Sequence, residues 1–216
     1  MTNPDLVNSL PTREIILHLL KTKGDMTTKD LTDELGITTM AVRRHIQSLE
    51  RDNLITSKIQ RQSIGRPTTV YCLTEQSVGY FPNKYHSLTL DILTELEEQL
   101  GPEAVEKIFE SRKNKMIEKY DQSMKAKNIS ERVETLANIQ NENGYMVGLE
   151  KISDDEFILK ENNCPISHVA MKYKKVCQCE LSMFKSLLGD AEVKRMECLA
   201  DGGQRCTYSI KVKKSN

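Results

Sequence analysis

The chain has 216 residues and carries 31 basic and 31 acidic side chains, so its formal net charge is zero. Its hydrophobic content of 38% and charged content of 29% are those of an ordinary soluble globular protein. This length is enough for one large or two small domains. No apolar run approaches the roughly 18–20 residues that span a bilayer, and the first ten residues do not resemble a secretion signal. We therefore expect a cytoplasmic protein with no membrane segment, in a compartment where thiols stay reduced.

The first third of the chain has the pattern of a winged helix-turn-helix. Apolar residues recur at helical spacing in three segments: 12–23, 28–35 and 38–52. Thr12 is the expected N-cap of the first helix. Two β-prone arms, 57–63 and 68–73, then flank a Gly-Arg-Pro turn. Three helices followed by a hairpin predict a DNA-binding domain over residues 1–76.

The third helix is expected to enter the major groove and to present its N-terminal part to the base edges. The residues left for DNA are Thr38, Thr39, Met40, Arg43, Arg44 and Gln47. Arginine pairs with guanine, glutamine pairs with adenine, and threonine contacts phosphate or a thymine methyl group. In the wing, Arg61 and Arg66 are expected to reach the adjacent minor groove or the phosphates of double-stranded operator DNA.

Charge distribution supports this interface. Between residues 38 and 73 there are six basic side chains and only two acidic ones, although the whole chain is neutral. Such a local basic bias is typical of a DNA footprint. A winged helix that contacts only protein is the alternative interpretation.

After a loop-like connection at 77–86, the remainder of the chain predicts helices followed by a mixed domain. Helical spacing is found in 88–100, 103–124, 130–141 and 169–188. β-prone runs are found in 145–152, 157–161, 193–200 and 206–212. We therefore expect a helical linker or dimerisation region over 87–142 and an α+β sensor domain over 143–216. The fold class of the whole chain is then α+β.

Five of the six cysteines lie in the last quarter of the chain. Cys164, Cys177 and Cys206 are separated by twelve and then twenty-eight residues, unlike the close Cys-x-x-Cys pairs of zinc ribbons. Wide spacing suits ligands gathered from separate elements around one cofactor, and thiolates are the ligands of iron–sulfur clusters. His168, four residues after Cys164, is a candidate fourth metal ligand. Three buried thiols that bind nothing are the competing interpretation.

The other cysteines have structural interpretations. Cys72 and Cys198 fall in predicted strands and are expected to pack as small hydrophobic side chains. Cys179 follows Cys177 by two residues, so the two point to different faces of a helix.

Two further functions stay open at this point. The same thiols are also suited to bind zinc, or to form a reversible disulfide under oxidant stress. A cysteine nucleophile in an enzyme would want a histidine base, and only His168 is close in sequence to a candidate cysteine. We therefore expect a regulator with no catalytic residues.

The cysteine motifs resemble those of a known family. Segments 163–166, 176–178 and 206–210 read Asn-Cys-Pro-Ile, Val-Cys-Gln and Cys-Thr-Tyr-Ser-Ile, and are similar to the SufR family of iron–sulfur-sensing repressors of cluster-assembly operons. The N-terminal segment resembles DeoR-like and ArsR-like winged helices. The resemblance implies a 4Fe–4S or 2Fe–2S cluster on Cys164, Cys177 and Cys206, and a homodimer that binds operator DNA until the cluster is lost. The motif does not fix a fourth ligand, and Cys179 and Cys198 match no family position.

Overall fold

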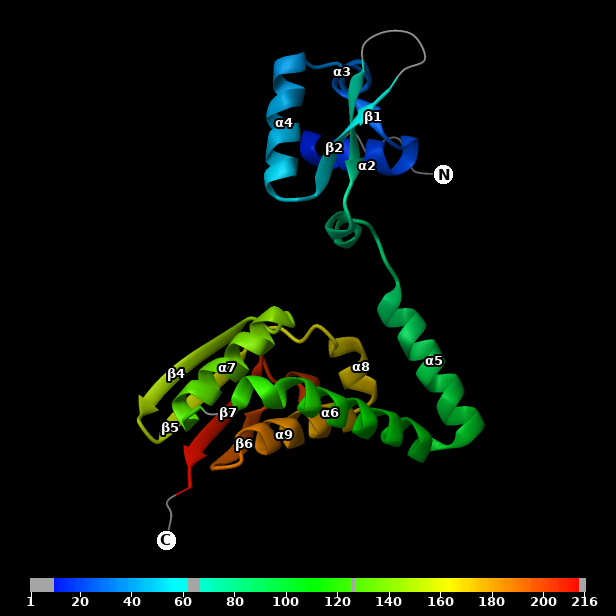
Figure 1. The fold of residues 1–216 in the computed structure, drawn as a ribbon. Coiled ribbons are helices and arrows are strands. Elements are labelled where there is room, and N and C mark those ends of the chain that lie inside the picture. The colour runs from blue at the N-terminus through cyan, green and yellow to red at the C-terminus, as the bar shows by residue number, and fades with distance from the viewer. Residues whose placement is uncertain (1–9, 62–66, 126, 214–216) are drawn as a thin grey trace. The chain divides into compact units, whose positions relative to one another are not determined.

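The computed structural model describes residues 10–61, 67–125 and 127–213 (Figure 1). The chain divides into two compact units, Met1–Asn83 and Lys84–Asn216. Each unit has its own hydrophobic core and combines helices with a small antiparallel sheet, which confirms the predicted α+β class. Within the described ranges, no helix is long and apolar enough to cross a bilayer.

The N-terminal unit is a winged helix-turn-helix, as the sequence predicts. Its helices are α2 (Thr12–Lys23), α3 (Thr28–Leu35) and α4 (Thr39–Arg51). Its strands are β1 (Met26–Thr27), β2 (Ile55–Gln60) and β3 (Thr68–Leu73), in the order β1-β3-β2. Strands β2 and β3 pair antiparallel along their full length and form the arms of the wing. The core buries one apolar face of each helix: Ile16, Leu20, Leu31, Val42, Ile46 and Leu49.

Short polar side chains fix where α3 and α4 begin. Thr27 and Asp30 form a capping box, in which each side chain accepts a hydrogen bond from the other residue's backbone N–H. Thr38 caps α4 by accepting a hydrogen bond from the Ala41 N–H at 3.3 Å. Gly36 ends α3 at φ 63°, a left-handed conformation that glycine adopts without strain. These caps set the short turn that places α4 after α3.

Two details of the predicted N-terminal unit are wrong. Thr12 is the first helical residue, and Pro11 occupies the cap position because its fixed φ suits the residue before a helix. The stretch expected to be a loop contains a 3₁₀ helix, η1 (Glu75–Tyr80). That helix is anchored by Ser77, which is 1% exposed and donates through its hydroxyl to the Thr74 carbonyl at 2.6 Å.

The C-terminal unit is a four-stranded sheet covered by helices. Its helices are α5 (Tyr85–Leu100), α6 (Pro102–Met124), α7 (Ile129–Glu142), α8 (Ser167–Lys172) and α9 (Lys175–Leu187). Its strands are β4 (Val147–Ser153), β5 (Glu156–Glu161), β6 (Ala191–Glu197) and β7 (Cys206–Val212), in the antiparallel order β4-β5-β7-β6. Helices α6, α7 and α9 lie on one face of this sheet (Figure 1).

The alternation of buried and partly exposed residues along the central strands explains which face of the sheet the helices cover. Phe157 and Leu159 on β5, and Tyr208 and Ile210 on β7, are at most 1% exposed, whereas the residues between them are partly exposed. The same core includes side chains from α5, α6 and α7. The expected linker helices and the expected sensor domain therefore share one hydrophobic core.

Two predicted elements of this unit have different ends. The single helical stretch expected at 169–188 is two helices, because the backbone leaves helical geometry at Tyr173 with φ −113° and ψ 82°. The Tyr173 ring is buried, and its hydroxyl donates to Glu97 Oε2 at 3.0 Å. The strand expected at 193–200 ends at Glu197, and a short 3₁₀ helix, η2 (Leu199–Asp201), follows it.

One acidic side chain lies in this core. Glu161 is 1% exposed at the end of the buried face of β5, and its Oε1 accepts a hydrogen bond from Gln140 Nε2 at 2.7 Å. Within the described residues, its Oε2 has no hydrogen-bond partner. Burial raises the pKa of Glu161 to about 9, and the neighbouring Glu180 carboxyl group acts in the same direction. Glu161 is therefore protonated near neutral pH.

A pH-dependent stability follows. Because folding raises the pKa of Glu161, its contribution to stability is fully present below the ordinary value of 4.5 and is lost as pH rises through about 9. We expect Glu161→Gln to flatten the pH dependence of thermal unfolding between those values, and to raise the midpoint at pH 8 by about 2–4 °C. Calorimetry across this pH range measures both effects. The exposed Glu150→Gln is the matched control, and equal pH slopes for the two variants would contradict the assignment.

Candidate functional site

Helix α4 presents the predicted DNA-reading residues to solvent. Its exposed residues include Thr39, Met40, Arg43, Arg44 and Gln47, and its exposed N-cap is Thr38. Met40 is 66% exposed, so an apolar group is available beside two guanidinium groups and an amide. This set can pair with guanine and adenine edges and contact a thymine methyl group.

A groove of about 680 Å³ lies beside α4. Its walls come from α4, from the start of α3 and from β3: Thr27, Thr28, Lys29, Asp30, Arg43, Ile46, Gln47, Glu50, Thr68, Thr69 and Tyr71. Lys29 and Arg43 bring positive charge to it, and Asp30 and Glu50 bring negative charge, although Asp30 is engaged in the α3 capping box. Cationic and hydroxyl groups of this kind bind a phosphodiester backbone.

The wing contributes an exposed edge strand. Strand β2 lies at the edge of its sheet, and its residues after Ile55 are exposed, including Lys58. Arg61 follows β2 and is exposed. Arg66 lies outside the described residues. The described part of the wing therefore offers Lys58 and Arg61 as cations.

In the C-terminal unit, Cys164, Cys177 and Cys206 line one small cavity, which we call the cysteine pocket. Its other lining residues are Ile166, Ser167, Ala170, Val176, Glu180, Leu199 and Ala200. The cavity volume is about 10 Å³, close to the room that a single water molecule needs. Three thiols that are far apart in sequence are thus brought together, in a space that is narrow in this conformation.

Each thiol comes from a different element. Cys164 lies in the loop after β5, and its carbonyl accepts from the Ser167 N–H at 3.1 Å. Cys177 lies on the face of α9 that packs into the core. Cys206 is the first residue of β7, opposite Glu161 of β5, and its sulfur accepts from the Leu199 N–H at 3.4 Å.

The three thiols are held in their protonated form. Burial raises the pKa of Cys164 to about 11, and that of Cys177 and of Cys206 to about 12. The carboxyl group of Glu180 acts in the same direction on all three. A thiol with a raised pKa is a poor nucleophile and reacts slowly with oxidants. Binding a metal centre would displace these protons.

Arg195 supplies a nearby positive charge. It lies on β6, and its Nη1 donates to the carbonyl of Cys177 at 2.9 Å. Burial opposes its charge, but the side chains of Cys198, Tyr208 and Cys177 favour the charged form and raise the pKa of Arg195. A guanidinium in this position would stabilise negative charge on the neighbouring sulfurs.

His168 is not among the residues that line the cysteine pocket. Its ring stacks on that of His86 from α5, with centroids 4.4 Å apart. The sequence argument placed Cys164 and His168 one turn apart on a helix, but α8 begins only at Ser167. Cys164 therefore lies in the loop before that helix, and the helical spacing does not apply to this pair.

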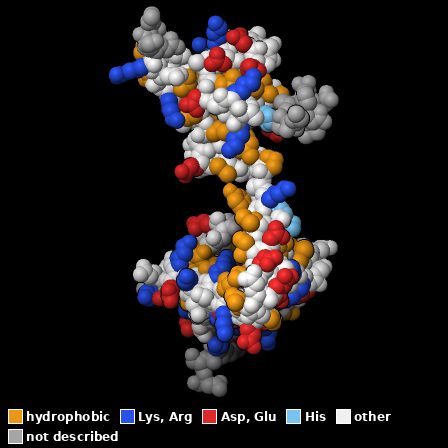
Figure 2. All heavy atoms as spheres, turned by 90° about the vertical axis from the view of Figure 1, so that its right-hand side faces the viewer, with side chains coloured by type: hydrophobic (Ala, Val, Ile, Leu, Met, Phe, Trp, Pro, Cys, Tyr) orange, Lys and Arg blue, Asp and Glu red, His pale blue; other side chains and the backbone are white. Residues whose placement is uncertain are grey.

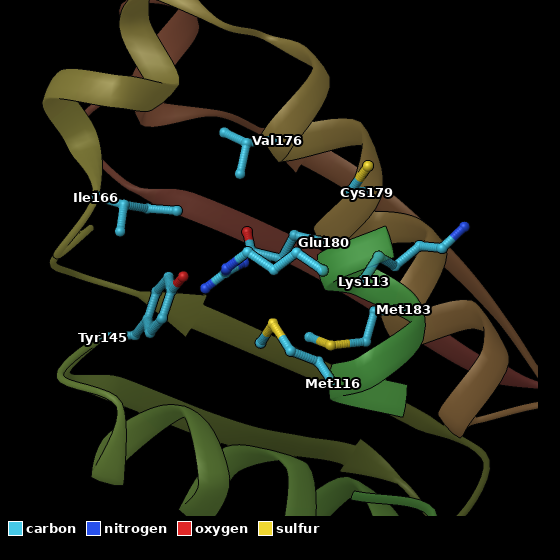
Figure 3. Close-up of a pocket in the computed structure, with 9 residues that line it drawn as sticks. Lys113, Met116, Tyr145, Ile166, Val176, Cys179, Glu180 and Met183 are labelled. Atoms are coloured by element: carbon cyan, nitrogen blue, oxygen red, sulfur yellow. The ribbon is translucent and has the colours of Figure 1, made fainter. Parts of the chain in front are cut away.

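Glu180 is a pocket residue that the sequence analysis did not identify. Its carboxylate accepts a hydrogen bond from the Tyr208 hydroxyl at 2.9 Å and interacts with the Tyr145 hydroxyl. Figure 3 shows Glu180 in a second cavity, with Tyr145, Met116 and Met183 around it. Glu180 lines both cavities and forms part of the wall between them. Its position three residues after Cys177 on α9 was the available sequence signal.

The remaining cysteines do not line the cysteine pocket. Cys72 is buried in the N-terminal unit, and its thiol donates to the Thr56 carbonyl at 3.5 Å. The Cys179 sulfur lies 3.6 Å from Glu110 Oε1 on the side of α6. Among the residues that the structure describes, no three His, Cys, Asp or Glu side chains stand in the arrangement that holds a metal ion.

Comparison with protein families gives one match. A model described as an HTH domain matches residues 12–62, which covers α2 to β2 of the N-terminal unit. None of the curated proteins matches the chain.

Several solved structures are similar to parts of the chain. The reduced form of the transcriptional regulator YodB from B. subtilis is 15% identical, over 47% of this chain and 98% of that one, with a TM-score of 0.30. ZitR from Lactococcus lactis in complex with DNA is 27% identical, over 45% and 66%, with a TM-score of 0.27. The phenol-responsive sensory domain of the transcription activator PoxR is 12% identical, over 61% and 76%, with a TM-score of 0.44.

These TM-scores are too low to carry an argument about the whole chain. The helix-turn-helix match and the winged-helix fold of the N-terminal unit agree with each other. Together they support a transcription regulator of the winged-helix type.

Proposed function

We propose that this chain represses genes of iron–sulfur cluster assembly, and that it senses a cluster held by Cys164, Cys177 and Cys206. The observation that carries the proposal is the convergence of these three thiols on one pocket, from a loop, a helix and a strand. Thiolates are the ligands of iron–sulfur clusters, so the donor set fits this group. A bound cluster would supply a redox- and oxygen-sensitive centre.

The state of the thiols favours a metal centre over direct oxidation. A redox-sensing cysteine is usually an exposed thiolate, whereas Cys177 and Cys206 are buried and their raised pKa keeps them protonated. A metal centre offsets the cost of deprotonating these thiols, because it bonds directly to the deprotonated sulfurs. Arg195 adds a cation beside Cys177.

The small volume of the pocket would couple cluster binding to a change in the conformation of the unit. A cavity of about 10 Å³ has to widen before it takes a cluster, so the segments that line it have to move apart. Ser167 and Ala170 belong to α8, and α8 packs against α5. The contact between them includes the stacked rings of His86 and His168 and a hydrogen bond from Lys172 Nζ to Thr94 Oγ1 at 2.6 Å. Cluster binding is thereby linked to the position of α5.

Helix α5 also supports a homodimer. Tyr85, Leu88 and Ile92 are 65%, 56% and 51% exposed, and their spacing places them on one stripe of the helix. Figure 2 faces this side of the unit and shows hydrophobic side chains alongside acidic ones. Exposed apolar stripes of this kind mark protein–protein contacts. A two-fold dimer would present two copies of α4 to a palindromic operator.

The cluster assignment is tested by three single substitutions. Cys164→Ser, Cys177→Ser and Cys206→Ser are each expected to remove most of the bound iron and sulfide, because a three-thiolate site loses one of its bonds. Visible absorbance and iron and sulfide analysis of protein purified without oxygen measure the loss. Cys72→Ser and Cys179→Ser are the matched controls. Cluster retention in all three variants would overturn the ligand assignment, and a colourless wild-type protein that resists reconstitution would favour zinc or thiol sensing.

The DNA-reading role is tested on α4. Arg43→Ala and Arg44→Ala are each expected to weaken binding to a selected operator by about 1–3 kcal/mol and to relax base preference. Sequence selection followed by fluorescence anisotropy at fixed salt measures both effects. Lys107→Ala, an exposed lysine on α6, controls for the loss of one positive charge. Unchanged affinity and preference in both arginine variants would contradict the role of α4.

The dimer is tested on the stripe of α5. Leu88→Glu combined with Ile92→Glu is expected to convert a dimer into a monomer at micromolar concentration, because two buried charges would be left unpaired. Sedimentation velocity measures the change. Ile152→Glu introduces a charge at a residue of β4 that is also exposed, at 53%, and should leave the mass unchanged. A wild-type monomer, or a double variant that stays dimeric, would contradict this interface.

A further inference from the structure

Cys198 does not line the cysteine pocket itself but directly precedes residues that do, although the sequence analysis assigned it to packing. It is 8% exposed, and the next two residues, Leu199 and Ala200, line the pocket. Its carbonyl accepts from the Asp201 N–H at 3.1 Å and the Gly203 N–H at 3.0 Å, which fixes the turn between β6 and β7. The backbone that carries the Cys198 thiol is therefore held in place beside the pocket wall.

The sheet register brings Cys198 next to Cys206. Glu197 of β6 pairs with Thr207 of β7, and Cys198 continues in an extended conformation with φ −136° and ψ 124°. The next pair of opposite positions is then Cys198 and Cys206, and Cβ atoms of opposite residues in antiparallel strands lie about 4.5–5.5 Å apart. The Leu199 N–H, which follows Cys198 directly, donates to the Cys206 sulfur at 3.4 Å.

Cys198 also interacts with the other two thiols. The side chains of Cys177 and Cys198 are within hydrogen-bonding contact of each other. Cys198 also acts on Cys164, but only electrostatically and less strongly than Glu180 and Glu161 do. Arg195, which donates to the Cys177 carbonyl, lies close enough to Cys198 to interact with its charge. Four thiols and one guanidinium group thus gather at this end of the sheet.

We infer that Cys198 is the fourth ligand of the centre held by Cys164, Cys177 and Cys206, which gives the pocket a four-thiolate donor set. This inference rests on the proposed iron–sulfur function. Four cysteines are the usual ligand set of such clusters. Each thiol releases its proton to solvent as it bonds to iron, and no electron transfer is needed for the ligation itself.

Glu180 is the competing donor, and its contacts favour Cys198. The Glu180 carboxylate already accepts hydrogen bonds from the hydroxyl groups of Tyr208 and Tyr145. Binding a metal through that carboxylate would compete with both phenols. Iron–sulfur clusters also prefer soft thiolate ligands over carboxylates.

Thiol protection in the full-length chain tests the inference without any substitution. The protein is reconstituted anaerobically with iron and sulfide, and cysteine alkylation by iodoacetamide is followed by mass spectrometry with and without the metal. We expect Cys198 to be protected together with Cys164, Cys177 and Cys206, and Cys179 to react equally in both samples. Protection of Cys164, Cys177 and Cys206 by the metal without protection of Cys198 would overturn the inference.

Substitution gives a second readout. Cys198→Ser is expected to release iron to a chelator at least tenfold faster than the wild-type protein, whereas Cys179→Ser should release it at the wild-type rate. Wild-type kinetics in Cys198→Ser would overturn the role of Cys198 and leave the proposed function intact. A wild-type protein that takes up no iron and sulfide would overturn both.

Discussion

The cysteine pocket depends on the packing of one face of α9 against the buried face of β7. The Tyr208 hydroxyl donates to Glu180 at 2.9 Å, and the rings of Phe184 and Tyr208 lie 4.9 Å apart. These two contacts fix how far the helix can slide along the strand. Cys177 precedes Glu180 by nearly one helical turn, and Cys206 precedes Tyr208 by one strand repeat. Both thiols are therefore placed at the same end of the layer, and the loop after β5 contributes Cys164 to the same pocket.

Local periodicity was enough to predict most elements, but contacts between distant segments were not predictable. The helix from Thr12 to Lys23 and the wing strands follow from spacing and turn residues, and their observed bounds differ little from expectation. The break at Tyr173 arises from burial of its ring, which no local pattern shows. Cys198 was placed in a strand, yet a register shift between Arg195 and Glu197 alters which side of β6 faces the core. Only the tertiary pairing with β7 determines that side.

The narrow pocket has a thermodynamic consequence. Burial raises the pKa of the Cys177 and Cys206 thiols, which lie around a cavity of about 10 Å³. A ligand that separates the walls has to displace the thiol protons and move α8, so the energy of metal–sulfur bonding is partly used to change conformation. A pocket that already had the size of its ligand would bind the ligand more tightly. Binding would then cause a smaller change in conformation. The small volume is therefore consistent with the proposed role of a sensor.

In such a mechanism, helix α5 would contact both the pocket helix α8 and the second copy of the chain. One side of it carries Thr94 and Glu97, which bond to Lys172 of α8 and to Tyr173. The other side carries the exposed stripe that begins at Tyr85, the second residue of the C-terminal unit. A shift of α8 would change the contacts on the first side of α5. Because a helix moves as a rigid body over a few turns, the same shift would also move the exposed stripe. In the proposed mechanism, pocket occupancy would therefore change the contact that the exposed stripe makes with a second copy of the chain.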